Sequence, residues 1–477
     1  MERTSAVALA SGLPKRRSKH TATVPRPSSS PTTEAASWME PQPRLTSSPR
    51  SSPPLVTRWK CTWTAECEQV RTWSRRSRSE LGRCSWDDLC CGDSHTTQTK
   101  YQATATAGQM AVTTVADIER LAMAKMEERL RAYIAIGAGD GQTLKENVEA
   151  FKRLRLRPRI LVDVEKVNTT TTVLGRPVSF PVGLAPSAAH KLVNPAGEIG
   201  SAQAAQGAGT VMILSSFSTV ALEDVRAAAP GCLLWQQTYI FRNRSITESL
   251  VKRAAARGFA AIVVTADSPV PGDGVCHLAY LAQLPHGLSF ANMQAAFTDE
   301  LQGCKLQDTY STDMDALVSA TLNDIEWLRG LSKLPVVVKG VLTAEAALQA
   351  YSHGAAAVIV SNHGGRQLDG TPATIDVLPE IVAAVGDKME VYLDSGVRTG
   401  ADVVKALALG ARAVFVGRPV LWGLAYDGKQ GVARVLHIFR EELERTLRLL
   451  GCSDIADLCE EFLITKNHCS RPFRSTL

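Results

Sequence analysis

The sequence predicts an α/β fold, a (β/α)8 TIM barrel, preceded by a disordered extension. Eight short apolar runs follow one another along the chain, and most of them are separated by alanine-rich segments at helical spacing. A run that is apolar on both faces is typical of a buried parallel strand, and a series of β-α units closes into a barrel. The predicted strands are Val182–Ala185, Thr210–Leu214, Leu233–Trp235, Ala261–Val264, Pro335–Val338, Ala356–Val360, Glu390–Leu393 and Ala413–Val416.

Helical segments are expected before, between and after these strands. A helical periodicity begins at Val112, with apolar residues from Ile118 to Leu130 on one face. The interval between strands 4 and 5 is much longer than the others, and only Leu317–Leu331 in it has the pattern of the expected helix. We therefore expect a long loop after strand 4, acting as a lid or mobile segment at the barrel mouth. An amphipathic helix over Val432–Leu450 should close the barrel.

The first 109 residues differ in composition from the rest of the chain. They are rich in Ser, Thr, Pro and Arg, and they hold 16 Lys+Arg against 9 Asp+Glu. Such a segment cannot bury enough apolar surface to offset its ordering entropy. We predict a disordered basic extension over 1–109 and a barrel domain over 110–470. The acidic residues and proline clusters do not suit a mitochondrial transit peptide, and Met110 is an alternative start.

Charge and cysteine content exclude several classes of function for the barrel domain. Its 37 basic and 38 acidic residues leave a net charge of −1, so the overall pI of 8.7 does not argue for nucleic-acid binding. No stretch is apolar for long enough to span a bilayer. The six cysteines after residue 109 form no pair at metal-ligand spacing, which predicts no metal site and favours a reducing compartment.

A base and an anion-binding group stand three residues apart after the sixth predicted strand, within Ser361–Gly370. His363 can take a proton near neutral pH, and Arg366 can hold a carboxylate in a bidentate fork. The two glycines between them let the backbone approach a flat ligand. This pairing predicts chemistry on a small carboxylate, and the alternative is an ordinary glycine-rich loop with a solvated arginine.

Polar residues follow every predicted strand, at the end of a barrel where function resides. So many polar groups would be costly without a ligand to satisfy them. Loops after strands 7 and 8 commonly hold phosphate, and here they supply glycine amides and arginines. Lys339 follows an apolar run, either as part of a buried ion pair or as a fixed charge beside a cofactor ring that becomes anionic on reduction. The strand-end residues are Pro186, Ser187, Ser215, Ser216, Gln237, Tyr239, Thr265, Lys339, Ser361, His363, Arg366, Asp394, Arg398, Gly417 and Arg418.

From about Val115 to Leu450 the chain resembles the FMN-dependent α-hydroxy acid oxidases, the glycolate oxidase group. The signature Ser-Asn-His-Gly-(Gly/Ala)-Arg-Gln-Leu-Asp of that family stands intact at Ser361–Asp369, and it is highly specific. The resemblance implies an (S)-2-hydroxy-acid oxidase that forms a 2-oxo acid, with O2 reoxidising FMN and giving H2O2. Supporting segments are Arg157–Leu161, Leu184–Ser187, Leu334–Gly340, Ala406–Gly410 and Val416–Pro419.

The resemblance also implies a role for each site residue. His363 would be the base, Arg366 and Tyr133 would bind the substrate carboxylate, and Tyr239 would contact the substrate hydroxyl. The flavin ring would lie against Ser215, Gln237, Thr265, Lys339 and Ser361, with the backbone of Pro186, Ser187 and Ala188. The ribityl phosphate would lie among Asp394, Gly396, Arg398, Gly417 and Arg418, in agreement with the phosphate site deduced from position alone.

Two departures from the family pattern bear on the substrate. Asp273 and Gly274 stand where members carry a basic pair, so one partner of the carboxylate is missing. We expect weaker affinity or a changed substrate, and the alternative is an FMN-binding homologue whose catalysis is weakened or lost. Phe217, where glycolate-preferring relatives have tryptophan, indicates altered side-chain selectivity. A haem-linked dehydrogenase is disfavoured, because the front segment has only His20 and His95 as candidate haem ligands.

The family resemblance also implies a peroxisomal homo-oligomer, a tetramer. The C-terminus, Arg474–Leu477, ends in Ser-Thr-Leu rather than Ser-Lys-Leu, so a receptor that needs the basic residue should bind it poorly. The cytosol is therefore the alternative location.

Overall fold

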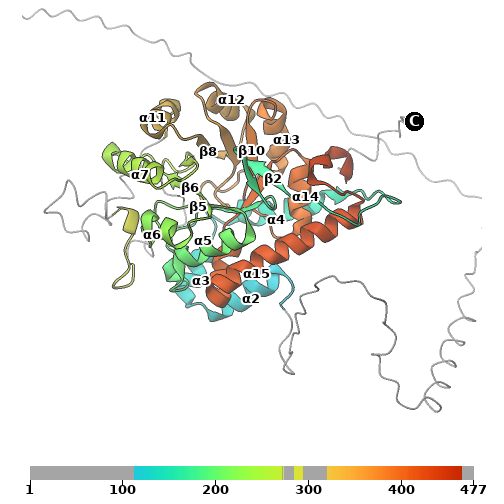
Figure 1. Cartoon of the computed structure of the whole chain (residues 1–477), viewed down its shortest axis with the longest axis horizontal. Coiled ribbons are helices and arrows are strands. Elements are labelled where there is room, and N and C mark those ends of the chain that lie inside the picture. The colour runs from blue at the N-terminus through green and yellow to red at the C-terminus, as the bar shows by residue number, and fades with distance from the viewer. Residues whose placement is uncertain (1–111, 271, 273–283, 294–319, 465–477) are drawn as a thin grey trace, which may run out of the picture. The chain divides into compact units, whose positions relative to one another are not determined.

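The computed structural model describes residues 112–270, 272, 284–293 and 320–464, and it contains the predicted barrel. Eight strands form a closed ring in the order β10-β11-β4-β5-β6-β7-β8-β9, and every neighbouring pair is parallel. Helices surround this ring (Figure 1). The barrel strands are β4 (Val182–Leu184), β5 (Val211–Leu214), β6 (Leu233–Thr238), β7 (Ile262–Thr265), β8 (Val336–Val341), β9 (Ala357–Val360), β10 (Glu390–Leu393) and β11 (Ala413–Val416). Each overlaps one predicted run, so the fold class is confirmed.

Large aromatic side chains fill the barrel interior. Trp235, Tyr392 and Phe415 are fully buried, and their ring centroids lie 5.6–5.7 Å apart. Glycine at position 183 makes room for them, because a Cβ there would lie 2.6 Å from the ring of Phe415. A tapered interior filled in this way is a packed core rather than a pore.

A β-hairpin covers the N-terminal end of the barrel. It consists of β2 (Thr171–Val173) and β3 (Arg176–Val178), and its turn residue Leu174 donates its N–H to the Tyr392 hydroxyl at 3.2 Å. Val173 and Val178 join the apolar cluster inside the barrel. The described hairpin therefore closes one end, and polar strand-end residues gather at the other.

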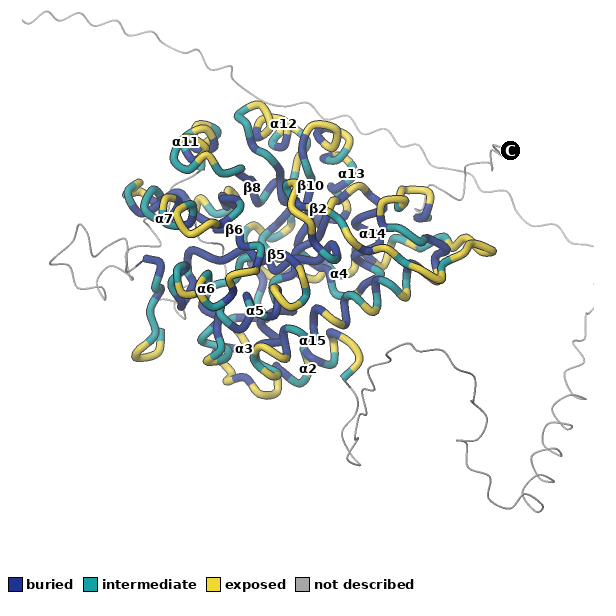
Figure 2. Tube along the Cα trace, viewed as in Figure 1, coloured by how far each residue is buried: buried dark blue, intermediate teal, exposed yellow. Residues whose placement is uncertain are grey.

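Amphipathic helices form the outer layer. Their apolar faces and the outward faces of the strands make one continuous core, which Figure 2 shows as the buried centre of the molecule. Valine and isoleucine dominate the strands because branched side chains suit a pleated surface. The helices that follow strands are α5 (Gly197–Ala208), α6 (Leu222–Ala228), α7 (Arg244–Ala256), α11 (Leu322–Ser332), α12 (Ala344–Ser352), α13 (Thr374–Val385), α14 (Gly400–Ala408) and α15 (Arg418–Leu450).

Three helices precede the barrel: α2 (Val115–Lys125), α3 (Glu128–Ala135) and α4 (Gln142–Arg153). A capping box between Thr114 and Asp117 starts α2. Both α2 and α5 pack against α15 (Figure 1). The predicted closing helix is the second half of α15, which has non-helical backbone at Asp427 and Gly428.

A short described part of the interval after strand 4 is attached to the barrel. In the segment 284–293, Ala291 donates its N–H to Ser218 O at 3.0 Å, and Asn292 Oδ1 accepts the N–H of Leu222 at 2.8 Å. Most of this interval lies outside the described residues, as does the extension over 1–109, so the mobile lid and the domain boundary stay predictions.

The last described strand pairs with the first one. The two are β1 (Arg155–Leu156) and β12 (Leu463–Ile464), and they are antiparallel. Within the described ranges, no helix is long and apolar enough to cross a membrane.

Candidate active site

The polar strand ends meet in one cavity at the C-terminal end of the barrel. Ser361 is fully buried behind the cavity, where it bonds to residues that line it. The other predicted site residues all line the cavity: Tyr133, Pro186, Ser187, Ala188, Ser215, Gln237, Tyr239, Thr265, Lys339, His363, Arg366, Asp394, Gly396, Arg398, Gly417 and Arg418. The structure thus brings together residues that are up to 285 positions apart in the chain.

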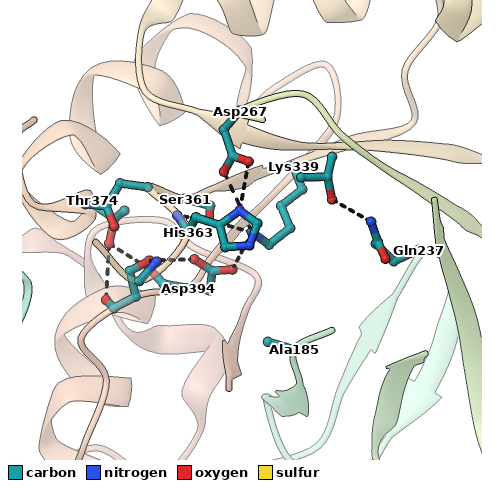
Figure 3. Close-up of polar contacts among 12 residues, drawn as sticks. Ala185, Gln237, Asp267, Lys339, Ser361, His363, Thr374 and Asp394 are labelled. Atoms are coloured by element: carbon teal, nitrogen blue, oxygen red, sulfur yellow. Dashed lines mark hydrogen bonds and ion pairs between the residues drawn. The ribbon is translucent and has the colours of Figure 1, made fainter. Parts of the chain in front are cut away.

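His363 is held by a carboxylate that comes from another strand end. Its Nδ1 lies 2.9 Å from Oδ1 of Asp267, which follows β7 (Figure 3). Burial opposes ionisation of Asp267, but the nearby His363 and Lys339 outweigh it and lower the pKa of the carboxyl to about 2. An ionised Asp267 accepts the Nδ1 proton, so Nε2 is the basic nitrogen of the neutral imidazole.

Lys339 carries a buried positive charge among three acceptors. Its Nζ donates to Ser361 Oγ at 2.9 Å and lies 3.5 Å from Asp394 Oδ2 and 3.9 Å from Asp267 Oδ2 (Figure 3). Only 3% of the residue is exposed. Two carboxylates compensate the ammonium, which explains how it is tolerated in a buried position. The sequence left two roles open for Lys339, a buried ion pair and a fixed charge beside a cofactor ring. The structure contains the ion pair, and a lysine in an ion pair can still lie beside a cofactor ring.

Two phenols and a guanidinium form another part of the wall. Arg366 Nη1 donates to Tyr133 O at 2.9 Å, and its guanidinium lies 5.0 Å from the centre of the Tyr133 ring. Burial raises the pKa of Tyr133, and it raises that of Tyr239 together with the charge of Asp267. Both phenols therefore stay neutral, and each can donate a hydrogen bond to an anion.

A second cluster of positive charge lies beside the loops after β10 and β11. Burial, together with Arg366 and Arg398, lowers the pKa of Arg418 to about 9. Burial also lowers the pKa of Arg398, whose guanidinium lies 5.1 Å from the Trp422 ring centre. Within the described residues, both guanidinium groups donate to backbone carbonyl oxygens and neither forms an ion pair, so they lack a directly bonded negative charge. An anionic group bound here would supply it.

Gln237 and Thr265 contact each other on adjacent strands. Gln237 Nε2 donates to Thr265 Oγ1 at 3.1 Å (Figure 3). Its Oε1 accepts the N–H of Ser216 at 2.9 Å. Ser215 Oγ accepts the N–H of Phe217 at 3.1 Å. This part of the wall is a fixed array of amide and hydroxyl groups.

Comparison with known proteins decides the family. The model of the FMN-dependent dehydrogenase family matches residues 122–465. The chain belongs to this family. It is 45% identical over 357 residues to glycolate oxidase 3 of Oryza sativa subsp. indica, which covers 74% of this chain and 96% of the relative. It is 44% identical over 352 residues to an L-lactate oxidase of Nostoc sp., which covers 73% and 96%. A solved mandelate oxidase with benzoyl-formic acid is 37% identical, has a TM-score of 0.67, and covers 75% of this chain and 99% of its own.

Membership of the FMN-dependent dehydrogenase family makes FMN the cofactor, and the residues fit it. The side chains of Arg398 and Arg418 line the cavity and form no ion pair among the described residues, and the phosphate of FMN would supply a directly bonded negative charge. A Cβ at Gly417 would meet Ser187 Oγ and Ala185 Cβ at ordinary van der Waals distances of 3.6 and 3.9 Å, so packing within the chain does not require a glycine at this cavity-lining position. Which residues contact the flavin ring and which contact the phosphate stays a prediction from the family resemblance.

Sequence reasoning missed Asp267 and Ser395. Asp267 stands two residues after the end of β7 in Thr265-Ala-Asp267, so the strand-end rule would have found it if extended beyond Thr265. Ser395 lies inside the predicted phosphate loop, and its hydroxyl bonds to both Asp394 and the backbone of Gly364. Asp273 and Gly274, where the family's basic pair is absent, lie outside the described residues.

Proposed function

We propose that this member of the FMN-dependent dehydrogenase family oxidises an (S)-2-hydroxy acid to the corresponding 2-oxo acid. One observation carries the proposal: a carboxylate-held base, His363 with Asp267, borders the same cavity as the carboxylate-binding groups Arg366 and Tyr133. The relatives named glycolate oxidase and L-lactate oxidase support it, because both names refer to 2-hydroxy acids.

Each residue of the substrate site has a distinct task. Arg366 and the neutral Tyr133 hold the carboxylate of the substrate, and Tyr239 donates a hydrogen bond to the substrate oxygen. His363 takes the proton released by the substrate at Nε2, and Asp267 stabilises the imidazolium that results. Arg366 bonds to backbone carbonyls in the structure, and this fixes its position for the substrate anion.

The cofactor residues divide into two groups. FMN, when bound, supplies a two-electron acceptor for the substrate. We assign its ring to Ser215, Gln237, Thr265, Lys339 and Ser361 with the backbone of Pro186, Ser187 and Ala188. Its phosphate we assign to Asp394, Gly396, Arg398, Gly417 and Arg418. The Lys339 charge would balance the negative charge that reduction places on the ring.

Phe217 supports a substrate with an apolar side chain. It lines the cavity, and its ring lies 5.6 Å from Tyr239, the residue we place at the substrate oxygen. Phenylalanine is smaller than the tryptophan of glycolate-preferring relatives, so it leaves room beside the substrate for a side chain larger than the hydrogen of glycolate. Lactate, longer aliphatic acids and mandelate are therefore the substrates to compare with glycolate.

Three wider expectations accompany the proposal. The electron acceptor is O2, which gives H2O2 as the second product. The enzyme is peroxisomal by family resemblance, with the cytosol as alternative, and the C-terminal tail lies outside the described residues. It forms a homo-oligomer, a tetramer by the same resemblance.

The decisive experiment is anaerobic reduction of the purified holoenzyme. The protein should be yellow and should bleach when glycolate, lactate, a long-chain 2-hydroxy acid or mandelate is added, and a His363→Ala variant should bleach far more slowly. A protein that binds FMN but bleaches with none of these acids would support the alternative of lost catalysis. If the His363→Ala variant bleached at the wild-type rate, His363 would not be the base.

A further inference from the structure

The loop that carries His363 has an unusual backbone conformation. His363, Gly364 and Gly365 have φ angles of 60°, 68° and 72°, so three consecutive residues lie in the left-handed region. Glycine adopts this region freely, whereas a residue with a Cβ is strained there. Such strain persists only where the surroundings over-determine the conformation. His363 itself contacts Asp267 through its ring and donates its N–H to Ser361 Oγ at 3.1 Å, and further contacts lie on its two neighbours.

The residue before His363 is held by α4. Asn362 and Asn147 are both buried and exchange two side-chain hydrogen bonds, Nδ2 of each donating to Oδ1 of the other at 2.8 and 2.7 Å. Asn362 Oδ1 also accepts the N–H of Gly365 at 3.1 Å. The signature segment Ser361–Asp369 contacts α4 a second time, at the first residues of the helix. There, Asp369 accepts the N–H groups of Gln142 and Thr143.

The residue after His363 is held by the loops at the cofactor end. Gly364 donates its N–H to Ser395 Oγ at 2.9 Å, and its carbonyl accepts from Arg418 Nη1 at 3.0 Å. Ser395 Oγ donates in turn to Asp394 Oδ1 at 2.8 Å. Ser395 itself has a φ of 73°, so the chain retains a second strained residue at the point where this bridge is made. A glycine would avoid that strain but would lack the hydroxyl.

We propose that Ser395 and Asn147 are positioning residues that clamp the two neighbours of His363 and hold it in the left-handed conformation. The clamp sets the direction of the imidazole between Asp267 and the cavity, and it joins the base to the loop assigned to the ribityl phosphate. This inference rests on the proposed role of His363 as the base. It differs from a packing role because both residues act through hydrogen bonds to the base loop.

Ser395→Gly separates function from folding. Glycine accepts a φ of 73° without strain, so the melting temperature should stay the same or rise. The bridge to Gly364 is lost, and kcat and the rate of anaerobic flavin reduction should both fall about tenfold, the factor expected for one hydrogen bond. KM, FMN affinity and the rate of reoxidation by O2 should stay unchanged. Unchanged kcat in this variant would refute the clamp.

The matched control is Lys333→Gly. Lys333 is another non-glycine residue in the left-handed region, with a φ of 58°, at the C-terminal end of α11 and away from the cavity. This variant should show the same or higher melting temperature with wild-type turnover. A kcat loss in the control equal to that in Ser395→Gly would mean that backbone relief alone causes the effect, and it would overturn the proposal.

A double variant tests whether Ser395 acts through the base. In a His363→Ala background, Ser395→Gly should cause no further loss of the residual rate, because the group it positions is absent. A full additional loss, or recovery of Ser395→Gly turnover at saturating FMN, would place the effect on the cofactor and contradict the clamp. If wild-type enzyme bleaches and His363→Ala does not, the proposed function stands whatever Ser395→Gly does.

The other half of the clamp has its own variant, Asn147→Leu. Leucine keeps about the size of the side chain and removes both hydrogen bonds to Asn362. Turnover should fall by a similar factor, again without a change in KM. Wild-type turnover would remove Asn147 from the proposal and leave the base loop held from one side.

Discussion

Asp267 illustrates how one partly buried carboxylate determines the chemistry of a neighbouring side chain. It accepts from His363 Nδ1, and its second oxygen lies 3.9 Å from Lys339 Nζ. We predict that Asp267→Asn lowers kcat about 100-fold, because the amide neither favours the required tautomer nor stabilises the imidazolium. Steady-state kinetics with the FMN-loaded variant measures this. A loss confined to KM would show that Asp267 serves substrate binding instead.

The same residue predicts a pH dependence of stability. The pKa of Asp267 is lowered from 3.8 to about 2 in the folded chain. The ionised carboxylate therefore contributes stability that is fully present above pH 4 and is lost as the pH falls toward 2. Melting temperatures of wild type and Asp267→Asn should differ most above pH 4 and converge as the pH is lowered through this window. A difference that stays constant with pH would contradict the assignment.

Arg398 tests the phosphate site at the level of one residue. Its guanidinium borders the cavity and makes one described side-chain hydrogen bond, Nη1 to Val397 O at 2.9 Å. In Arg398→Met, FMN affinity should fall roughly 10- to 100-fold, because a charge-assisted bond to phosphate is lost. The apoprotein should keep its melting temperature, because the desolvation cost of the charge is removed together with this one bond. Flavin-fluorescence titration and thermal melts of apoprotein measure both.

At the scale of elements, the segment 284–293 packs against the outer side of Phe217, a residue of the cavity wall. Phe290 is 3% exposed, and its ring lies 5.2 Å from Phe217 at an angle of 62°. Phe290→Leu should let Phe217 move and should change the ratio of kcat/KM for mandelate over glycolate by about threefold or more. Met293→Ala is the control, since Met293 is equally buried in the same segment but carries no aromatic ring. An equal change in the control would mean that the segment acts only through stability.

The elements also show what a sequence can and cannot predict. Each barrel strand was predictable because branched apolar runs are buried on both faces, as in Val336–Val341. The hairpin of β2 and β3 was not, because short strands with an exposed face contain no apolar run. The first half of α15 was missed because Gly417 and Arg418 were interpreted as a phosphate loop, although one glycine can end a loop and begin a helix.

At the site, residue types were predictable and backbone conformation was not. The strand-end rule and the family signature together identified residues that do line one cavity, including Tyr133 and Arg418. Nothing in the amino-acid sequence indicates that His363 and Ser395 have positive φ angles, because that conformation depends on contacts from distant segments. The clamp could therefore be found only in three dimensions.

For the whole molecule, the catalytic unit should be separable from the first 109 residues. The family match begins at residue 122, and an alignment of 357 residues covers 96% of glycolate oxidase 3 of Oryza sativa subsp. indica. The first described helix begins at Val115 with its own capping box, and Arg434 on α15 donates to Val112 O at 2.9 Å. The elements that build the described barrel and its cavity therefore all follow Met110.

A chain that begins at Met110 should fold, bind FMN and turn over as the full chain does. Its melting temperature should agree within about 2 °C, since no contact among the described residues is removed. Its net charge changes from +6 to −1 when 16 basic and 9 acidic residues are lost, so it should no longer bind a cation exchanger at pH 7. A chain that begins at Gly141 provides the contrast, because it lacks α2, α3 and Tyr133 and should lose stability and turnover. If the Met110 chain fails in the same way, the first 109 residues belong to the catalytic unit and the boundary predicted from composition is wrong.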